Sequence, residues 1–318
     1  MCSKQSVSSI QGSESKDNMT EITGLNLKNP TILAAGVMGT TGASLARIAW
    51  EGAGAVVTKS IGPEPKGGHS NPSMIDLGYG FLNAMGLPNP SYPDFSGEIE
   101  IAKREADVPV IASIFGGNAQ EFAIVADGLV DAGPDAFELN VSCPHAQGYG
   151  ASIGCDACAV EEITAAVCDI TEIPVWVKLT PNVTDIVSIG KAAQRGGADA
   201  VVAINTVRGM AIDIHSGYPV LGNRFGGLSG RAIKPVAIKC VYDLYAALDI
   251  PIIGVGGIST WEDAVEMMMA GASAVQIGSA VHDGPEIFRT IADGIESFMS
   301  SGGYRDTSEI VGLAHRRA

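Results

Sequence analysis

The sequence predicts an α/β fold, a (β/α)₈ or TIM barrel, because two kinds of apolar strand alternate along the chain. One kind follows small residues such as glycine and alanine, and the other is led by proline. With a first strand at 30–35, the count reaches eight. Short, nearly all-apolar strands separated by helical segments indicate a parallel sheet that is covered on its outer face. Eight such units fit a barrel of this length.

The strands follow one another in a regular order. Proline-led strands lie in 108–113, 173–178 and 250–254, and strands after small residues lie in 52–59, 132–140, 197–205 and 271–278. The segments between them show helical apolar spacing, as at 163–170 and 264–269. A doubly wound open sheet is the alternative architecture, but an even run of eight units favours the barrel.

The domain organisation follows from length and composition. A chain of 318 residues that is 46% hydrophobic can bury a large core, as one large domain or two ordinary ones. We expect a single catalytic barrel domain over 19–318, with long inserted loops at 60–97, 143–158 and 206–229. Residues 1–18 are polar, and we interpret them as a disordered extension, a tag or an upstream start rather than a signal peptide.

Charge and cysteine usage limit the possible partners and compartment. A formal net charge of −15 argues against nucleic acid and anionic membranes as partners, and no apolar run is long enough to cross a bilayer. Six cysteines in a chain of this length do not form a disulfide framework, so a cytoplasmic location is expected. The five histidines show no ligand spacing and Cys155–Cys158 is a single pair, so no metal site is expected.

The predicted carboxyl ends of the strands are polar or glycine, in contrast to the strand interiors. A barrel of this kind carries its active site at that end. The simpler alternative is that strand ends are polar because they meet water, but two lysines and two asparagines on one rim favour a site. The strand ends in question are Lys59, Ser113, Asn140, Lys178, Asn205, Gly256 and Gly278.

The segment Asn140-Val141-Ser142-Cys143-Pro144-His145 is the strongest candidate for catalysis. A thiol becomes a base when it loses its proton, an amide can bind a polar ring, and proline stiffens the exit from the strand. A buried structural cysteine is the alternative. The position of Cys143 at a strand end, before a glycine-rich loop, favours the functional interpretation.

Glycine-rich turns follow the last two strands, at Gly254-Val255-Gly256-Gly257-Ile258 and at Gly278-Ser279. A third, Gly226-Gly227-Leu228-Ser229-Gly230, precedes a helical segment. Exposed backbone N–H groups at such turns bind phosphate, and barrels often place a phosphate site after strands seven and eight. Ordinary turn glycines are the alternative, but three such loops together predict phosphate binding.

These residues resemble class 1 dihydroorotate dehydrogenases, most closely the 1B subclass, over about residues 20–300. The resemblance implies a TIM barrel that binds FMN and oxidises dihydroorotate to orotate in pyrimidine biosynthesis. The segments that carry it are Thr58-Lys59-Ser60, Asn83-Ala84-Met85-Gly86-Leu87, 140–144, Asn205-Thr206-Val207-Arg208-Gly209-Met210-Ala211-Ile212-Asp213, 227–235 and 254–258.

The resemblance also implies a role for each matching residue. Cys143 is the implied base. The implied substrate-binding residues are Lys59, Asn83, Met85, Gly86, Leu87, Asn140, Asn205 and Thr206. The implied FMN-binding residues are Ala35, Lys59, Ser60, Ser113, Asn140, Lys178, Ile204, Gly230, Gly256, Gly257, Gly278 and Ser279.

The subclass implies a homodimer and a separate electron-transfer subunit that carries FAD and a [2Fe–2S] cluster and reduces NAD. Three positions depart from the family pattern, namely Ser113, His145 and Arg231. Ser-Cys-Pro-His also occurs in dihydropyrimidine dehydrogenases, so uracil or thymine is the second possible substrate class. A flavin-free barrel isomerase or synthase acting on a phosphorylated substrate, and a non-catalytic scaffold, are the remaining hypotheses.

Overall fold

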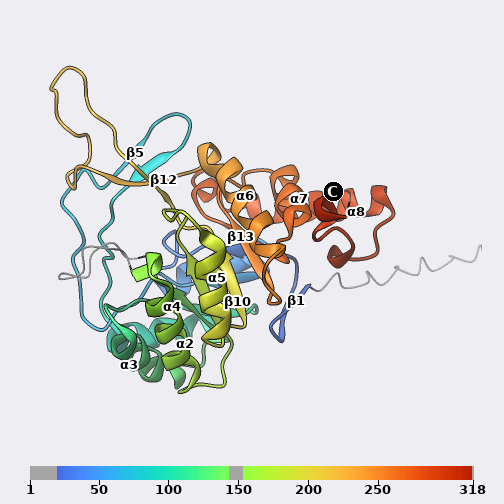
Figure 1. The fold of residues 1–318 in the computed structure, drawn as a ribbon, viewed down its shortest axis with the longest axis horizontal. Helices are drawn as coiled ribbons and strands as arrows, with labels where there is room; N and C mark the ends of the chain where they lie inside the picture. The colour runs from blue at the N-terminus through green and yellow to red at the C-terminus, as the bar shows by residue number, and fades with distance from the viewer. Residues whose placement is uncertain (1–19, 143–152, 317–318) are drawn as a thin grey trace, which may run out of the picture.

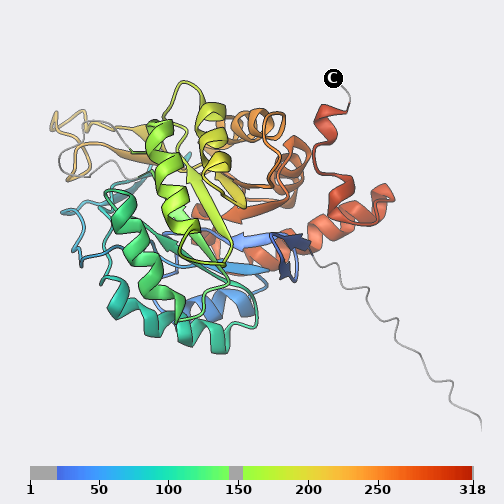
Figure 2. The same ribbon diagram turned by 60° about the horizontal axis from the view of Figure 1, so that its bottom comes forward.

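The computed structural model describes residues 20–142 and 153–316, in which eight parallel strands close into a barrel. The strands occur in the predicted chain order, and β14 pairs with β3 to complete the circle (Figure 2). The prediction of a TIM barrel is therefore confirmed, and the open doubly wound sheet is wrong. The barrel strands are β3 (Thr31–Leu33), β4 (Ala55–Val57), β7 (Val110–Ile114), β8 (Ala136–Asn140), β9 (Val175–Leu179), β10 (Ala200–Ala203), β13 (Ile252–Val255) and β14 (Ala274–Ile277).

Helices surround the barrel, and the main apolar core lies between them and the strands (Figure 1). Several begin at a side-chain cap, as at Asn118, Asp156 and Thr260, which accept hydrogen bonds from the first turn. Across 20–142 and 153–316, none of the helices is both long and apolar enough to span a membrane. The helices are α1 (Gly42–Trp50), α2 (Tyr92–Glu105), α3 (Ala119–Val130), α4 (Ala157–Cys168), α5 (Ile186–Arg195), α6 (Lys234–Tyr245), α7 (Trp261–Ala270) and α8 (Ile287–Gly302), with the 3₁₀ turns η1 (Ile153–Cys155), η2 (Arg231–Ile233), η3 (Ser279–Asp283), η4 (Thr307–Glu309) and η5 (Leu313–His315).

The small-residue segments recur because they connect neighbouring strands at their first residues. The backbone N–H of Asp135 donates to the carbonyl of Val110 at 2.8 Å, and the Asp135 carboxylate accepts the N–H of Val110 at 2.7 Å. Asp199 makes the same pair of bonds with Val175, both at 2.8 Å. Each aspartate therefore satisfies the backbone where a buried strand begins.

A hairpin of β1 (Thr20–Ile22) and β2 (Leu25–Leu27) covers the amino end of the barrel. Ile22 and Leu27 are buried against side chains of the barrel interior, including Trp176. The Trp176 indole donates to the Thr23 hydroxyl at 3.0 Å. The amino end is therefore filled, which leaves the carboxyl end for a ligand.

Two of the predicted loops at the carboxyl end contain strands that pair with each other. The strands β5 (Met74–Asp76), β6 (Phe81–Asn83), β11 (Val207–Gly209) and β12 (Gly226–Ser229) form an antiparallel sheet in the order β11-β12-β6-β5. This sheet belongs to the part of the chain that protrudes beside the barrel in Figure 1. The loop predicted at 60–97 is shorter in the structure, because α2 already begins at Tyr92. Short glycine-rich strands that pair over a long sequence distance leave no local pattern.

Candidate active site

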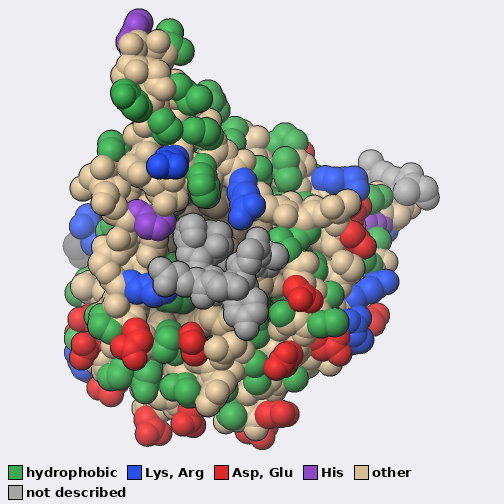
Figure 3. Space-filling view, turned by 60° about the vertical axis from the view of Figure 1, so that its left-hand side comes forward, with side chains coloured by type: hydrophobic (Ala, Val, Ile, Leu, Met, Phe, Trp, Pro, Cys, Tyr) green, Lys and Arg blue, Asp and Glu red, His purple; other side chains and the backbone are tan. Residues whose placement is uncertain are grey.

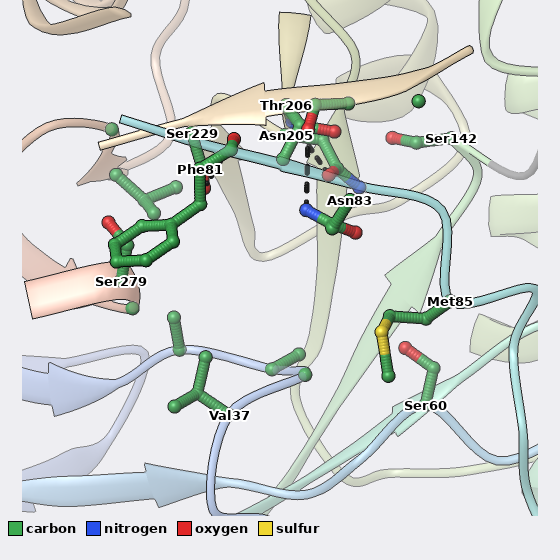
Figure 4. A pocket seen from close by; sticks show the side chains of 18 of the residues that line it. Val37, Ser60, Phe81, Asn83, Met85, Ser142, Asn205, Thr206, Ser229 and Ser279 are labelled. Carbon is green, nitrogen blue, oxygen red and sulfur yellow. Dashed lines mark hydrogen bonds between the residues drawn. The ribbon is translucent and has the colours of Figure 1, made fainter. Parts of the chain in front are cut away.

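A cavity of about 760 Å³ lies at the carboxyl ends of the barrel strands, next to the antiparallel sheet. Figure 4 shows Asn83, Asn205 and Thr206 close together, with Phe81 and Ser279 on another side of the cavity. Its wall contains nearly all of the described residues for which the sequence implies a role. These are Ala35, Lys59, Ser60, Asn83, Met85, Gly86, Leu87, Asn140, Lys178, Ile204, Asn205, Thr206, Gly230, Gly256, Gly257, Gly278 and Ser279.

Asn140 is the centre of a set of hydrogen bonds at the end of β8. Its Nδ2 donates to the Ser60 hydroxyl at 3.1 Å, while its Oδ1 accepts from Asn205 Nδ2 at 3.4 Å and from the Ser142 N–H at 3.3 Å. Because partners are placed on both ends of the amide, its orientation is fixed. Ser142, the last described residue before Cys143 in the sequence, also lines the cavity.

Asn83 reaches the cavity from the antiparallel sheet rather than from the barrel. Its Nδ2 donates to the Gly227 carbonyl of β12 at 3.3 Å. A Cβ atom at Gly227 would lie 2.0 Å from Thr206 Oγ1, so only glycine lets β12 approach the end of β10. Leu87, which lines the cavity next to Gly86, has φ of 55°, an unfavourable value for a residue other than glycine.

Lys178 is held by a buried polar network on the floor of the cavity. Its Nζ lies 2.9 Å from Gln276 Oε1 and 3.4 Å from Glu138 Oε1. Gln276 Nε2 in turn donates to Glu138 Oε2 at 2.6 Å. Lys178 and Gln276 line the cavity, whereas Glu138 is fully buried beneath it.

The cavity is cationic in a protein that is acidic overall. Lys59, Lys66, Lys178 and Arg208 line it, and no described lining residue is an aspartate or glutamate. Figure 3 shows Lys, Arg and His side chains across the middle of the face that carries the antiparallel sheet, and Asp and Glu gathered toward its lower part. Burial lowers the pKa of the Lys59 ammonium group below its ordinary value. Such a cavity favours an anionic ligand.

The three predicted glycine loops meet on one side of the cavity. Gly230 precedes η2, Gly256 and Gly257 follow β13, and Gly278 and Ser279 follow β14. Gly257 has φ of 75°, and a Cβ atom there would lie 2.8 Å from the Lys234 backbone nitrogen. Glycine is therefore required for the loop after β13 to pack against the start of α6. Backbone N–H groups brought together in this way suit a phosphate.

Ser113 is the one described candidate that does not line the cavity. It is fully buried, and its hydroxyl lies 2.9 Å from that of Ser60, so it supports Ser60 from below. In this structure Ser113 therefore supports Ser60, and its contact with a cofactor stays a prediction. Two other candidates, Cys143 and His145, lie outside the described residues.

Sequence reasoning missed several residues of the cavity wall. Gln276 and its partner Glu138 were visible as polar interruptions of apolar strands, which was the signal that could have identified them. The remaining residues had no local signal, because their position depends on the antiparallel sheet and the loops. They include Lys66, Phe81, Thr180, Asn182, Arg208 and His282.

Cys155 and Cys158, which the sequence left unassigned, are both exposed free thiols. Cys155 lines the cavity and its thiol lies 3.6 Å from the Asn182 carbonyl, whereas Cys158 belongs to the first turn of α4. Arg231, the third departure from the family pattern, donates from Nε to the Ser259 hydroxyl at 2.9 Å.

Comparisons with known proteins agree with this site. The family model described as dihydroorotate dehydrogenase matches residues 18–299. The chain is 72% identical over 298 residues to a protein of Methanosarcina mazei named dihydroorotate dehydrogenase B (NAD(+)), catalytic subunit, covering 93% of this chain and 95% of that one. It is 54% identical over 292 residues to a Pyrococcus abyssi protein of the same name, covering 92% and 97%.

A solved structure shares the fold. The crystal structure of the Eimeria tenella enzyme DHODH in complex with ferulenol superposes with a TM-score of 0.82 over 98% of this chain and 92% of that one, at 22% identity. From the family match over most of its length and the high identity to the curated catalytic subunits, the chain belongs to the dihydroorotate dehydrogenase family, in its B-type catalytic-subunit branch.

Proposed function

We propose that this chain oxidises dihydroorotate to orotate in pyrimidine biosynthesis, with FMN as the hydride acceptor. The observation that carries this proposal is the cluster of amides at Asn83, Asn140 and Asn205 beside a cationic cavity wall free of described carboxylates. Dihydroorotate has cyclic amide groups and a carboxylate. The amide side chains match the ring, and a lysine matches the carboxylate.

The substrate fits the part of the cavity that is lined by Lys59 and Ser60, which follow β4, and by Asn83 from the antiparallel sheet. Lys59, Asn83, Asn140 and Asn205 would bind its polar groups, with Thr206 and backbone from Met85 to Leu87 completing the enclosure. Uracil and thymine lack a carboxylate and would leave the half-buried ammonium of Lys59 without an anionic partner. The acidic pyrimidine is therefore the better match.

FMN fits the remaining wall. Ala35, Ser60, Lys178 and Ile204 would contact its ring, and backbone at Gly230, Gly256, Gly257, Gly278 and Ser279 would hold its phosphate. When bound, FMN supplies the acceptor for the hydride, and the chain supplies orientation and charge. A cationic Lys178 beside the ring would favour negative charge on the reduced cofactor.

Cys143 is the proposed base. It follows Ser142, whose backbone N–H donates to Asn140 and which lines the cavity. The Cys143 thiolate would take the proton from C5 while the hydride leaves C6, so that a C5–C6 double bond forms and two electrons leave with the hydride. A thiol is uncharged at neutral pH unless its surroundings favour the thiolate.

The electrons then need an outlet before the next molecule of dihydroorotate can react. We propose a separate subunit with FAD and a [2Fe–2S] cluster, a homodimer of the present chain and a cytoplasmic location. The name "catalytic subunit" of the relatives supports a partner. If the purified chain alone reduced NAD at the full rate of dihydroorotate oxidation, the separate subunit would be contradicted.

Anaerobic bleaching of the flavin tests the reaction directly. Purified protein is mixed with dihydroorotate and, separately, with dihydrouracil, in wild type and in Cys143→Ser. Fast bleaching by dihydroorotate only, much slowed by the substitution near neutral pH, is expected. Bleaching by dihydrouracil alone would overturn the proposed substrate, and a colourless protein that takes up no FMN would overturn the flavin chemistry.

A further inference from the structure

Glu138 and Lys178 are the only charged side chains among the described residues that are buried, at 0% and 5% exposure. Glu138 lies on β8, Lys178 on the adjacent β9, and Gln276 on β14, which is opposite β8 in the barrel. The hydrogen bond between Glu138 and Gln276 therefore crosses the barrel interior. A charged pair at such a place requires an explanation beyond packing.

Each polar atom of this network has a defined partner. Gln276 presents Oε1 to Lys178 at 2.9 Å and Nε2 to Glu138 at 2.6 Å, so both of its neighbours determine which way the amide faces. Glu138 accepts from Lys178 with one oxygen and from Gln276 with the other. The three side chains thus form a closed set of contacts that restricts the ammonium of Lys178 to one place.

Stability alone does not explain the network. Replacing a buried ion pair by well-packed apolar residues is often neutral or stabilising, because desolvation costs offset the attraction of the charges. The neighbouring interior of the barrel is apolar, with Ile111, Ala136 and Val202 fully buried. The network also connects the cavity with the barrel interior, because Lys178 and Gln276 line the cavity whereas Glu138 does not.

We propose that Glu138 and Gln276 are positioning residues that set the place and the effective charge of the Lys178 ammonium at the cofactor ring. This inference rests on the proposed flavin chemistry and extends it to two residues that act through Lys178. Glu138 holds the Lys178 Nζ from beneath the cavity, at 3.4 Å, and its carboxylate weakens the positive potential that Lys178 projects into the cavity. Gln276 accepts a hydrogen bond from the Lys178 ammonium group and so keeps this group from moving closer to the Glu138 carboxylate.

The test is a double-mutant cycle read out by the reduction potential of bound FMN, equilibrated with a reference dye. Loss of the negative charge in Glu138→Gln should raise the ratio of affinities for reduced and oxidised FMN by roughly tenfold to a hundredfold, the range expected for one charge about 6 to 12 Å away at an effective dielectric near 20. In a Lys178→Met background, the ammonium group through which Glu138 is proposed to act is absent. There, the same substitution should change the ratio by less than about twofold.

Gln276→Met serves as a second variant, because it removes the amide and leaves both Glu138 and Lys178 in place. This variant should lower the ratio of affinities for reduced and oxidised FMN several-fold, because the Lys178 ammonium group moves toward Glu138. The effect is opposite in sign to that of Glu138→Gln. Glu162→Gln on the exposed side of α4 is the matched control and should leave the potential unchanged. Thermal unfolding of each variant shows whether the barrel is intact.

The inference is overturned if Glu138→Gln leaves the potential unchanged, or if it shifts the potential equally with and without Lys178. A shift of the same sign in Gln276→Met would also overturn the assigned role of that amide. Failure of the proposed function is seen separately, in the wild type, as a lack of FMN binding or of bleaching by dihydroorotate.

Discussion

Asn140 and Ser60 lie 80 residues apart in the sequence, yet their side chains are joined by a hydrogen bond of 3.1 Å at the edge of the cavity. The Ser60 hydroxyl is in turn 2.9 Å from that of Ser113, which is fully buried. The backbone N–H of Ser113 donates to Thr58 Oγ1 at 3.0 Å. The orientation of the Asn140 amide is therefore set from beneath the site.

Ser113→Ala tests this support without changing the cavity wall. Ser60 loses one hydrogen-bond partner, and about 1 kcal/mol of lost orientation corresponds to a decrease of roughly fivefold in kcat/KM for dihydroorotate. Steady-state kinetics measure the effect. Ser96→Ala, which removes an exposed hydroxyl bonded to the Pro93 carbonyl on α2, is the control. Unchanged kinetics in Ser113→Ala would show that Ser60 holds Asn140 unaided.

Arg208 is expected to attract the anionic substrate rather than to take part in chemistry. It is exposed on β11 at the cavity wall, and no described acidic residue lines the cavity beside it. Arg208→Gln should raise KM for dihydroorotate by several-fold at low ionic strength and leave kcat unchanged. The difference should nearly vanish at about 1 M salt, where charges are screened within roughly 3 Å.

Lys191→Gln on α5 is the matched control for Arg208, because it removes one exposed positive charge away from the cavity. Its KM should follow that of the wild type at every salt concentration. An effect of Arg208→Gln that persists at high salt, or that appears in kcat, would instead indicate direct contact with the substrate.

The barrel was predictable from the sequence because its signals are local. Each buried strand is a short apolar run, and residues such as Asp135 and Asp199 mark strand starts through bonds to the first residue of the preceding strand. The polar residues at strand ends were predictable for the same reason. Asn140, Lys178 and Asn205 follow from strand boundaries together with the rule that barrel sites lie at carboxyl ends.

The antiparallel sheet and the pairing of side chains within the buried network were not predictable, because they depend on contacts between distant segments. β6 pairs with β12, so the place of Asn83 beside Gly227 is decided by residues more than a hundred positions apart. Ser113 illustrates the same limit. Its position at a strand end predicted a cavity residue, but the side chain of Ser113 points to Ser60 within the wall.

The cysteines should differ widely in reactivity. Burial, with Asp199 and Asp169 nearby, raises the pKa of Cys168 to about 11, and its thiol lies 3.4 Å from the Gly197 carbonyl. Cys155 and Cys158 are exposed. Because the thiolate is the reactive form, iodoacetamide at pH 8 should label Cys155 and Cys158 well before Cys168.

Peptide mapping by mass spectrometry gives the order of labelling. Since Cys155 lines the cavity, its labelling should slow when dihydroorotate is bound, whereas labelling of Cys158 should not. Equal protection of both thiols would point to a change in α4 rather than to a ligand beside Cys155. Rapid labelling of Cys168 would contradict its raised pKa.

Because of Lys59, the binding of dihydroorotate should change with pH, at pH values below those at which a lysine usually titrates. Burial lowers its pKa in the empty cavity, and only its ammonium form attracts a carboxylate. Affinity should therefore be constant below this lowered pKa and fall by up to about tenfold per pH unit above it. Because the bound anion favours the ammonium form, binding near that pKa should also take up a proton.

Binding is measured calorimetrically in the Cys143→Ser variant, so that turnover and titration of the Cys143 thiol do not interfere. Two buffers of different ionisation enthalpy give the proton count. Lys59→Arg keeps its charge at every accessible pH, so the decline should disappear even though the absolute affinity is lower. If the same decline remained in Lys59→Arg, another group would be responsible, and Lys59 would not be the partner of the carboxylate.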